Sequence, residues 1–212
     1  RPTNFGESFS VKSVPEPNDL AYTSIALTPH TDNPYRKPIP CIQILHCLQN
    51  EVKGGFSTLV DGFAVAEYLK KNHHNLFKIL TKVKVRFRFV DKTVILENWG
   101  ELIELDENNK VKQVRFSTRV DYVPALEKKE LKQFYEARKL ISKLYTSKKF
   151  EIKFKLEKGD LIMMDNYRLL HGRTSYDPNE GKRYLKGCYI DHDSTEGKLR
   201  YLERKFGLKW KK

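Results

Sequence analysis

The chain has 212 residues, of which 39% are hydrophobic and 12% aromatic, so it can bury the core of one domain and is not a disordered composition. No apolar run approaches the roughly 18 residues that a membrane-spanning helix needs. The formal net charge of +13 leaves nucleic-acid binding open, but the lysines are scattered and accompany no nucleic-acid-binding motif. A lysine-rich solvated surface is therefore the favoured explanation. The cysteines at 41, 47 and 188 lack paired spacing, which favours a reducing compartment.

The first half of the chain predicts short strands and two short helices. Residues 1–40 are rich in Pro, Asn, Ser and Thr and predict loops with short strands. The apolar run at 41–48 predicts a buried strand, and 54–62 predicts a short strand between two turns. Asp61 can cap the helix that follows this strand, and a second short helix is expected over 74–80.

The second half continues with strands around one longer helix. Residues 83–91 alternate strictly between apolar and basic side chains, as a half-buried strand does. The sequence DENN at 106–109 lies between two strand-like segments and predicts a hairpin. Apolar residues recur at helical spacing over 127–146, which predicts an amphipathic helix. Further strands are expected at 150–156, 161–166 and 183–191.

Many short strands with two helical insertions predict a mainly β fold. The chain lacks the regular alternation of strands and helices that is typical of a parallel sheet, so an antiparallel sandwich or jelly roll with helices packed outside is favoured. We expect residues 1–212 to form a single domain. We also expect an upstream N-terminal segment to be missing, because the chain begins without Met in what reads as folded sequence.

The strongest chemical signal is the run His30-Thr31-Asp32. In an extended segment, residues two apart point to the same face, so the imidazole of His30 and the carboxylate of Asp32 would converge. His171, at the end of the strand-like LIMMDNYRLL, is the natural third ligand from an adjacent strand. Two histidines and one carboxylate that leave other coordination positions open are typical of non-haem Fe(II) oxygenases.

Other histidines keep alternatives open, since a His-x-Asp run also occurs by chance and the chain has six histidines. His192 lies between Asp191 and Asp193 and could belong to a metal site, although it follows the last predicted strand in a polar stretch. His46 lies inside an apolar strand. It is expected to be either a hydrogen-bonded core residue or a residue that supports the metal ligands.

Several longer stretches carry a family resemblance. They are AYTSIALTPHTDNPYR, IQILHCL, GGFSTLVDGF, LEKGDLIMMDNYRLLHGRTSY and RYLKGCYID. In this order they resemble the gamma-butyrobetaine hydroxylase and trimethyllysine hydroxylase branch of the TauD/TfdA-type dioxygenases. The resemblance implies a double-stranded β-helix with Fe(II) as the cofactor and 2-oxoglutarate and O2 as co-substrates, and with ascorbate in a supporting role. It also places the iron ligands on His30, Asp32 and His171.

The resemblance further implies where 2-oxoglutarate binds. The arginine that holds its distal carboxylate falls on Arg183, and a guanidinium pairs well with a carboxylate. Arg173 is a competing candidate for this role. Leu45 and Asp19 match positions that lie near the co-substrate, although an aspartate at position 19 is at odds with an anionic ligand.

The substrate site that the resemblance implies is an aromatic cage. A quaternary ammonium cannot donate a hydrogen bond and is held by the faces of aromatic rings. The matching positions are all aromatic in this sequence: Phe5, Phe9, Tyr22 and Tyr189. These residues could also be core aromatics. Phe5 and Phe9 replace a Tyr and a Trp of animal butyrobetaine hydroxylases, which suggests a different trimethylammonium substrate. Arg119 matches the region that contacts the anionic end of the substrate.

The function that the resemblance implies is hydroxylation of a trimethylammonium substrate, first of all gamma-butyrobetaine to carnitine. A trimethylaminoalkyl phosphonate or trimethyllysine is the alternative with the same chemistry. The alternative from another class is a non-catalytic metal-binding or nucleic-acid-binding module. The favoured interpretation is a cytoplasmic enzyme that acts on a small molecule and has no nucleic-acid or membrane partner. A homodimer stays open, because relatives carry a small N-terminal domain that contributes to dimerisation.

Overall fold

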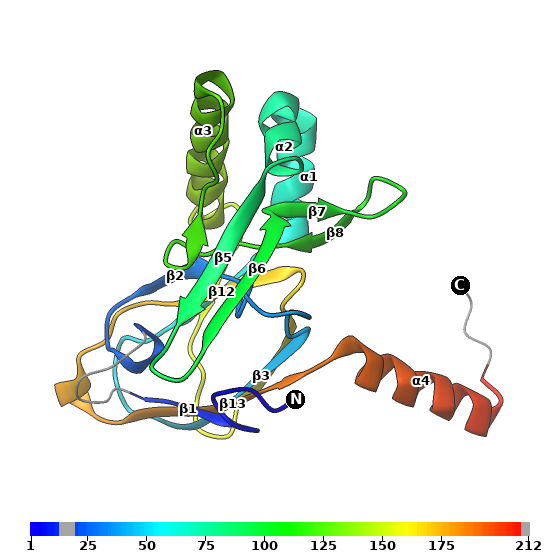
Figure 1. The fold of residues 1–212 in the computed structure, drawn as a ribbon. Helices are drawn as coiled ribbons and strands as arrows, with labels where there is room; N and C mark the ends of the chain where they lie inside the picture. The colour runs from blue at the N-terminus through cyan, green and yellow to red at the C-terminus, as the bar shows by residue number, and fades with distance from the viewer. Residues whose placement is uncertain (13–19, 209–212) are drawn as a thin grey trace.

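The framework of the protein is a pair of four-stranded antiparallel sheets (Figure 1). The computed structural model describes residues 1–12 and 20–208. The first sheet contains, in spatial order, β1 (Phe9–Val11), β13 (Arg183–Ile190), β3 (Ile42–Asn50) and β11 (Leu161–Asp165). The second contains β10 (Glu151–Phe154), β4 (Ser57–Asp61), β12 (Leu169–Arg173) and β2 (Leu27–His30). Strands that are neighbours in space come from distant parts of the chain, as a jelly roll requires.

A long insertion separates β4 from β10. It contains α1 (Gly62–Asn72), α2 (His74–Leu80), β5 (Lys84–Val90), β6 (Ile95–Glu101), β7 (Ile103–Leu105), β8 (Val111–Val114), β9 (Asp121–Tyr122) and α3 (Lys128–Tyr145). The three helices stand together on one side of the molecule, and the β5–β6 hairpin runs from them across the sheets (Figure 1). The helices predicted after Asp61, over 74–80 and over 127–146 are confirmed.

Local sequence signals explain where these elements begin and turn. Asp61 Oδ1 accepts hydrogen bonds from the N–H groups of Phe63 at 3.0 Å and Ala64 at 3.2 Å, which caps α1 as predicted. The predicted hairpin is the β7–β8 pair, whose turn holds Asn109 at a φ of 59°. Asn tolerates this left-handed conformation better than most residues. Asp106 supports the turn by accepting the N–H of Lys110 at 2.8 Å.

The larger hydrophobic core is formed mainly by the insertion itself and does not lie between the two sheets. Helices α1 and α3 contribute the fully buried Leu69, Phe134 and Ile141, and β5 contributes Phe87. A smaller cluster joins the sheets and consists of Cys47, Leu156 and Leu185. Because most of the apolar packing is outside the sheets, the space between their inner faces is available for a ligand pocket.

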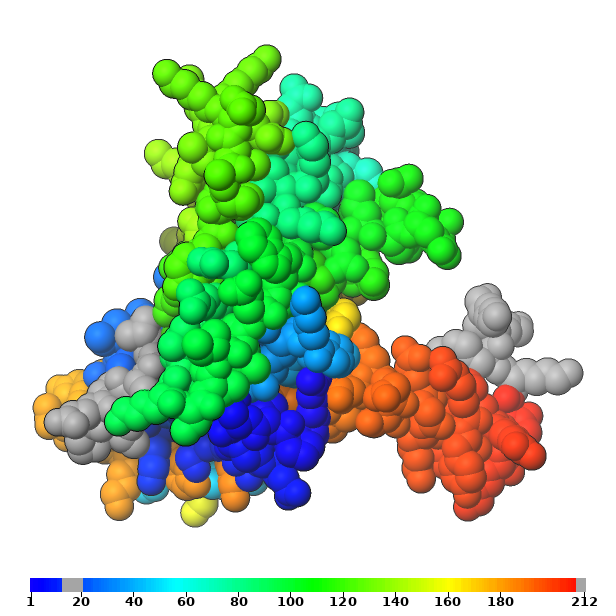
Figure 2. Space-filling view, viewed as in Figure 1, coloured from blue at the N-terminus to red at the C-terminus, as the bar shows by residue number. Residues whose placement is uncertain are grey.

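Two short 3-10 helices and one further α-helix complete the fold. The 3-10 helices cover Leu20–Tyr22 and Pro178–Glu180. Helix α4 (His192–Phe206) follows β13 and projects away from the rest of the molecule (Figures 1 and 2). The sequence predicts only a polar stretch here, and the helix that forms buries none of its residues. Within residues 1–12 and 20–208, no helix combines the length and apolar character needed to span a bilayer.

Candidate metal centre

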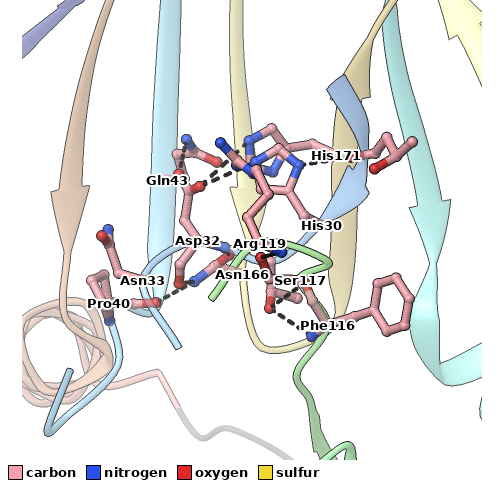
Figure 3. A network of polar contacts seen from close by, with 12 residues as sticks. His30, Asp32, Asn33, Pro40, Gln43, Phe116, Ser117, Arg119, Asn166 and His171 are labelled. Atoms are coloured by element: carbon pink, nitrogen blue, oxygen red, sulfur yellow. Dashed lines mark hydrogen bonds and ion pairs between the residues drawn. The ribbon is translucent and has the colours of Figure 1, made fainter. Parts of the chain in front are cut away.

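The structure brings the three predicted metal ligands together (Figure 3). His30 ends β2, and His171 lies directly opposite it on β12. Asp32 follows β2 and turns its carboxylate toward the two imidazoles. Asp32 Oδ1 lies 3.5 Å from His30 Nε2 and 3.8 Å from His171 Nε2. The three side chains offer one ligand atom each, and these atoms all lie within 4.8 Å of one another.

Thr31, which lies between His30 and Asp32 in the sequence, bonds to Phe116. Its N–H donates to the carbonyl of Phe116 at 2.9 Å, and its Oγ1 accepts the N–H of Phe116 at 3.1 Å. These bonds fasten the segment that carries His30 and Asp32 to residue 116. Ser117 and Arg119, which follow Phe116, line the same pocket as the metal ligands.

The electrostatics of the three ligands suit a divalent metal. His30 Nδ1 contacts the carbonyl oxygen of Thr28 at 2.8 Å, which places a proton on Nδ1 and leaves the lone pair on Nε2. Burial is the main reason that the pKa of His171 falls to about 4, so this ring is neutral at pH 7. Burial alone would raise the pKa of Asp32, but His171, His30 and the hydrogen bond from Tyr189 hold it well below its usual range. Two imidazoles and a carboxylate match the donor set of non-haem iron.

Asp32 is fixed from several sides (Figure 3). Its N–H donates to Asn166 Oδ1 at 2.7 Å, and its carbonyl accepts from Asn166 Nδ2 at 3.0 Å. The carboxylate oxygen Oδ2 accepts from Gln43 Nε2 at 2.5 Å and from the Tyr189 hydroxyl at 2.7 Å. Asn166 and Gln43 were not among the residues predicted from the sequence. The available signals were a polar residue at the end of a buried strand and one within the apolar run 41–48.

A cavity of about 460 Å³ contains the ligand site. It lies between the inner faces of the two sheets and reaches the β5–β6 hairpin. All of the predicted co-substrate and substrate residues that the structure describes line it: Phe5, Phe9, Tyr22, Leu45, Arg119, Arg183 and Tyr189. Asp19, predicted near the co-substrate, lies outside the described residues.

The aromatic wall of the cavity is larger than predicted. The rings of Phe9 and Tyr189 are 5.0 Å apart. Phe5 meets Phe89 edge to face at 5.8 Å, and Phe89 stacks on Tyr35 at 5.0 Å. Phe89 belongs to β5 and reaches the pocket only because the insertion folds back over the sheets. The sequence predicted the strand that carries Phe89, but it did not predict that the insertion folds back over the sheets.

Two buried arginines lie at the pocket, and their contacts differ. Arg173 donates to the carbonyls of Thr23 at 2.7 Å and Ile25 at 2.8 Å, so it supports the chain before β2. Arg183 is 7% exposed. The Nε atoms of both arginines lack a hydrogen-bond partner in the part of the chain that the structure describes, so the difference lies in the terminal nitrogens that Arg173 uses to bond carbonyls. Burial, together with the charge of Arg173, lowers the pKa of Arg183 to about 10. Both guanidinium groups lie over the ring of Tyr176. This arrangement favours Arg183 over Arg173 as the group available to an anion.

The other histidine predictions do not lead to a second site. His46 is half-buried and lies on the face of β3 opposite Leu45, so it does not line the pocket. The ring of His192 packs against Tyr167 at 4.8 Å, and its Nε2 lies 3.6 Å from Asp165 Oδ1. Among residues 1–12 and 20–208, His192 belongs to no group of three ligands close enough to hold a metal.

The family model and the curated relatives that match this chain agree on one family. Residues 1–189 match the family model described as taurine catabolism dioxygenase TauD, TfdA family. The chain is 34% identical to the gamma-butyrobetaine dioxygenase of Pseudomonas sp. (strain AK-1) and 36% identical to that of Homo sapiens. It is 34% identical to the trimethyllysine dioxygenase of Meyerozyma guilliermondii. These matches cover 96%, 96% and 95% of this chain but 53%, 54% and 51% of the relatives. The chain therefore spans about half the length of the curated relatives it matches.

Solved structures with the same architecture are oxygenases. An asparagine oxygenase with Fe(II), hydroxyasparagine and succinate superposes with a TM-score of 0.68 at 17% identity, over 87% of this chain and 56% of the other. The oxygenase OrfP with Fe and alpha-ketoglutaric acid gives 0.66 at 17% identity, over 92% of this chain and 59% of the other. At these identities the likeness concerns the fold, and it confirms the predicted jelly roll.

Proposed function

Because the chain belongs to the TauD/TfdA family of dioxygenases, we propose that its protein is an Fe(II)- and 2-oxoglutarate-dependent hydroxylase of a trimethylammonium substrate. The observation that carries this proposal is the meeting of His30, Asp32 and His171 in a cavity with an aromatic wall and a buried arginine. Gamma-butyrobetaine is the first candidate substrate, supported by the names of relatives at 34% and 36% identity.

The proposed roles at the metal follow from the donor set. His30, Asp32 and His171 would hold Fe(II), which when bound supplies the activation of O2 coupled to decarboxylation of 2-oxoglutarate. Arg183 would bind the distal carboxylate of 2-oxoglutarate, because a buried guanidinium without a described anionic partner is stabilised by one. Leu45 faces the same cavity and would form an apolar wall beside the co-substrate. The protein's contribution is to orient these reactants and to keep water away from them.

The proposed roles at the substrate follow from the aromatic wall. A trimethylammonium group has no N–H to donate, so aromatic faces are its natural partners. The proposed cage consists of Phe5, Phe9, Tyr22 and Tyr189. Arg119 would contact the anionic end of the substrate. A trimethylaminoalkyl phosphonate or trimethyllysine fits the same arrangement, and the trimethyllysine dioxygenase at 34% identity supports the latter.

The setting of the enzyme is also part of the proposal. We propose a single catalytic domain over residues 1–212 and a cytoplasmic location, which the free thiols of Cys41, Cys47 and Cys188 support. No nucleic-acid partner is expected, and both a monomer and a homodimer stay open. The mass of the protein in solution, measured by light scattering with and without added DNA or RNA, tests both points.

Succinate formation tests the function directly. The Fe(II)-loaded protein is assayed with 2-oxoglutarate and O2, with and without gamma-butyrobetaine, beside His30→Ala and the control His46→Ala. Stimulation by gamma-butyrobetaine that His30→Ala abolishes and His46→Ala keeps supports the activity and the substrate. Iron-dependent turnover without stimulation rejects this substrate in favour of the phosphonate or trimethyllysine. Nucleic-acid binding without iron-dependent turnover would favour the non-catalytic alternative and contradict the proposal.

A further inference from the structure

The two oxygens of the Asp32 carboxylate have different surroundings (Figure 3). Oδ1 lies toward the two imidazoles, 3.5 Å from His30 Nε2 and 3.8 Å from His171 Nε2. Oδ2 is occupied by two donors, the amide of Gln43 at 2.5 Å and the hydroxyl of Tyr189 at 2.7 Å. Donors gathered on one carboxylate oxygen leave the other oxygen as the one available to a metal.

Gln43 is a buried polar residue whose position the carboxylate explains. It is 2% exposed and lies on the inner face of β3, two residues before Leu45. Its Nε2 donates to Asp32, whereas its Oε1 has no partner among the described residues. A carboxylate only accepts hydrogen bonds, so the amide nitrogen must be the atom that faces it. A leucine would be less costly to bury at a position that served packing alone.

Tyr189 approaches the same oxygen from the neighbouring strand. It pairs directly with Gln43 in the register of β13 and β3, so the sheet itself brings the two donors to one point. Its side chain is nearly buried, and its ring contacts Phe9 in the aromatic wall. One side chain thus contacts the proposed substrate cage through its ring and the metal ligand through its hydroxyl.

We propose that Gln43 and Tyr189 are positioning residues that hold Asp32 as a single-oxygen ligand of the metal. The identity of the metal rests on the proposed function, whereas the orientation of the ligand rests on contacts within this chain. With Oδ2 occupied by these two donors, the carboxylate would offer a metal Oδ1 alone. The other coordination positions would then be left for small molecules, as a two-histidine, one-carboxylate site requires.

Two substitutions that each remove one donor test this proposal. Gln43→Leu removes the amide, and Tyr189→Phe removes the hydroxyl while keeping the ring. Co(II) is added in place of Fe(II), because its visible absorption reports the number and arrangement of its ligands. We expect each variant to bind Co(II) roughly tenfold or more weakly and to show a changed absorption spectrum as Oδ2 is released.

Matched controls come from the same two strands. In Tyr184→Phe the lost hydroxyl contacts Ser10 at 3.1 Å, and in Gln49→Leu the lost amide contacts Glu51 at 2.7 Å. Both controls should keep the Co(II) affinity and spectrum of the parent. The proposal is overturned if Gln43→Leu and Tyr189→Phe also keep them. If Gln43→Leu does not fold, as circular dichroism would show, Tyr189→Phe decides alone.

The same samples separate this inference from the proposed function. If the parent binds Co(II) and the two variants change its spectrum, the positioning role is supported even when no substrate stimulates succinate formation. That combination would reject only the proposed function. If the parent fails to bind Co(II) in a manner that depends on His30, the positioning role is overturned together with the metal site.

Discussion

His30 on β2 lies directly opposite His171 on β12, and the centroids of their imidazole rings are 4.5 Å apart. Because these strands are neighbours in the second sheet, backbone hydrogen bonds fix two of the three ligands. Asp32 follows the end of β2 and has no such pairing, so side chains from other elements hold it. The relative placement of the three predicted ligands therefore also depends on residues that are not ligands themselves, above all on Asn166.

Asn166 is predicted to be essential for the stability of the site. It is 1% exposed, and its side chain bonds the N–H and carbonyl of Asp32 and the carbonyl of Pro40 at 2.8 Å. Asn166→Ala leaves buried backbone groups without partners, which should lower the free energy of unfolding by about 3 kcal/mol. Urea denaturation monitored by circular dichroism measures this loss.

The matched control for this prediction is Asn72→Ala. Asn72 is exposed at the end of α1, and its side chain bonds the carbonyl of Tyr68 within its own helix at 2.8 Å. Its replacement should change the free energy of unfolding by less than about 0.5 kcal/mol. Equal losses for Asn72→Ala and Asn166→Ala would contradict the role assigned to Asn166.

Arg183 and Arg173 should respond differently to replacement by lysine. Arg183→Lys keeps the charge but loses the planar fork, so the dissociation constant for 2-oxoglutarate should rise about tenfold to a hundredfold. Arg173→Lys should mainly lower stability, because it breaks the bonds to the carbonyls of Thr23 and Ile25. Isothermal titration with 2-oxoglutarate and thermal melts of both variants separate the two effects. If only Arg173→Lys binds 2-oxoglutarate more weakly, then Arg173 and not Arg183 binds its distal carboxylate.

Much of the fold was predictable because local patterns and tertiary structure agree. The strict alternation at 83–91 predicted a strand, which is β5, and the apolar spacing at 127–146 predicted a helix, which is α3. Helix α4 was not predicted, although Leu199, Leu202 and Phe206 recur in it at helical spacing. The pairing of strands was also beyond local patterns, because β1 pairs with β13 and β2 with β12 across most of the chain.

The candidate site was predictable where residue type and spacing carry the chemistry. The run His30-Thr31-Asp32 predicted two of the three residues that meet at the candidate metal centre. The residues that hold the ligands could not be found this way. Gln43 meets Asp32 only because β3 and β13 bring it there, and a single polar residue in an apolar strand does not reveal its partner.

Glu104 should make stability depend on pH. Burial raises the pKa of Glu104, but hydrogen bonds from Lys112 and Arg115 outweigh burial and hold the pKa below its ordinary value of 4.5. A carboxyl with a lowered folded-state pKa contributes stability above its unfolded pKa and loses it as the pH falls. Glu104→Gln should therefore cost about 1 to 2 kcal/mol at pH 7, discounted for the partial exposure of Glu104.

Urea titrations between pH 7 and pH 3 test this dependence. The difference between the parent and Glu104→Gln should shrink as the pH falls below 4.5 and the parent carboxyl gains its proton. Glu107→Gln, at an exposed position in the adjoining turn, is the control and should match the parent throughout. A cost of Glu104→Gln that is the same at pH 7 and pH 3 would show that the charge of Glu104 is not what stabilises the buried Arg115.

Helix α4 should exchange its amide protons far faster than helix α3. No residue of α4 is buried, and Leu199, Tyr201 and Phe206 are exposed, whereas α3 buries Phe134 and Ile141. An isolated helix of this length is marginal in water, so protection in α4 should stay within about tenfold of an unfolded chain. Hydrogen exchange followed by mass spectrometry compares the two helices within one sample. Slow exchange in α4 that disappears on dilution would instead show that another copy of the chain covers it.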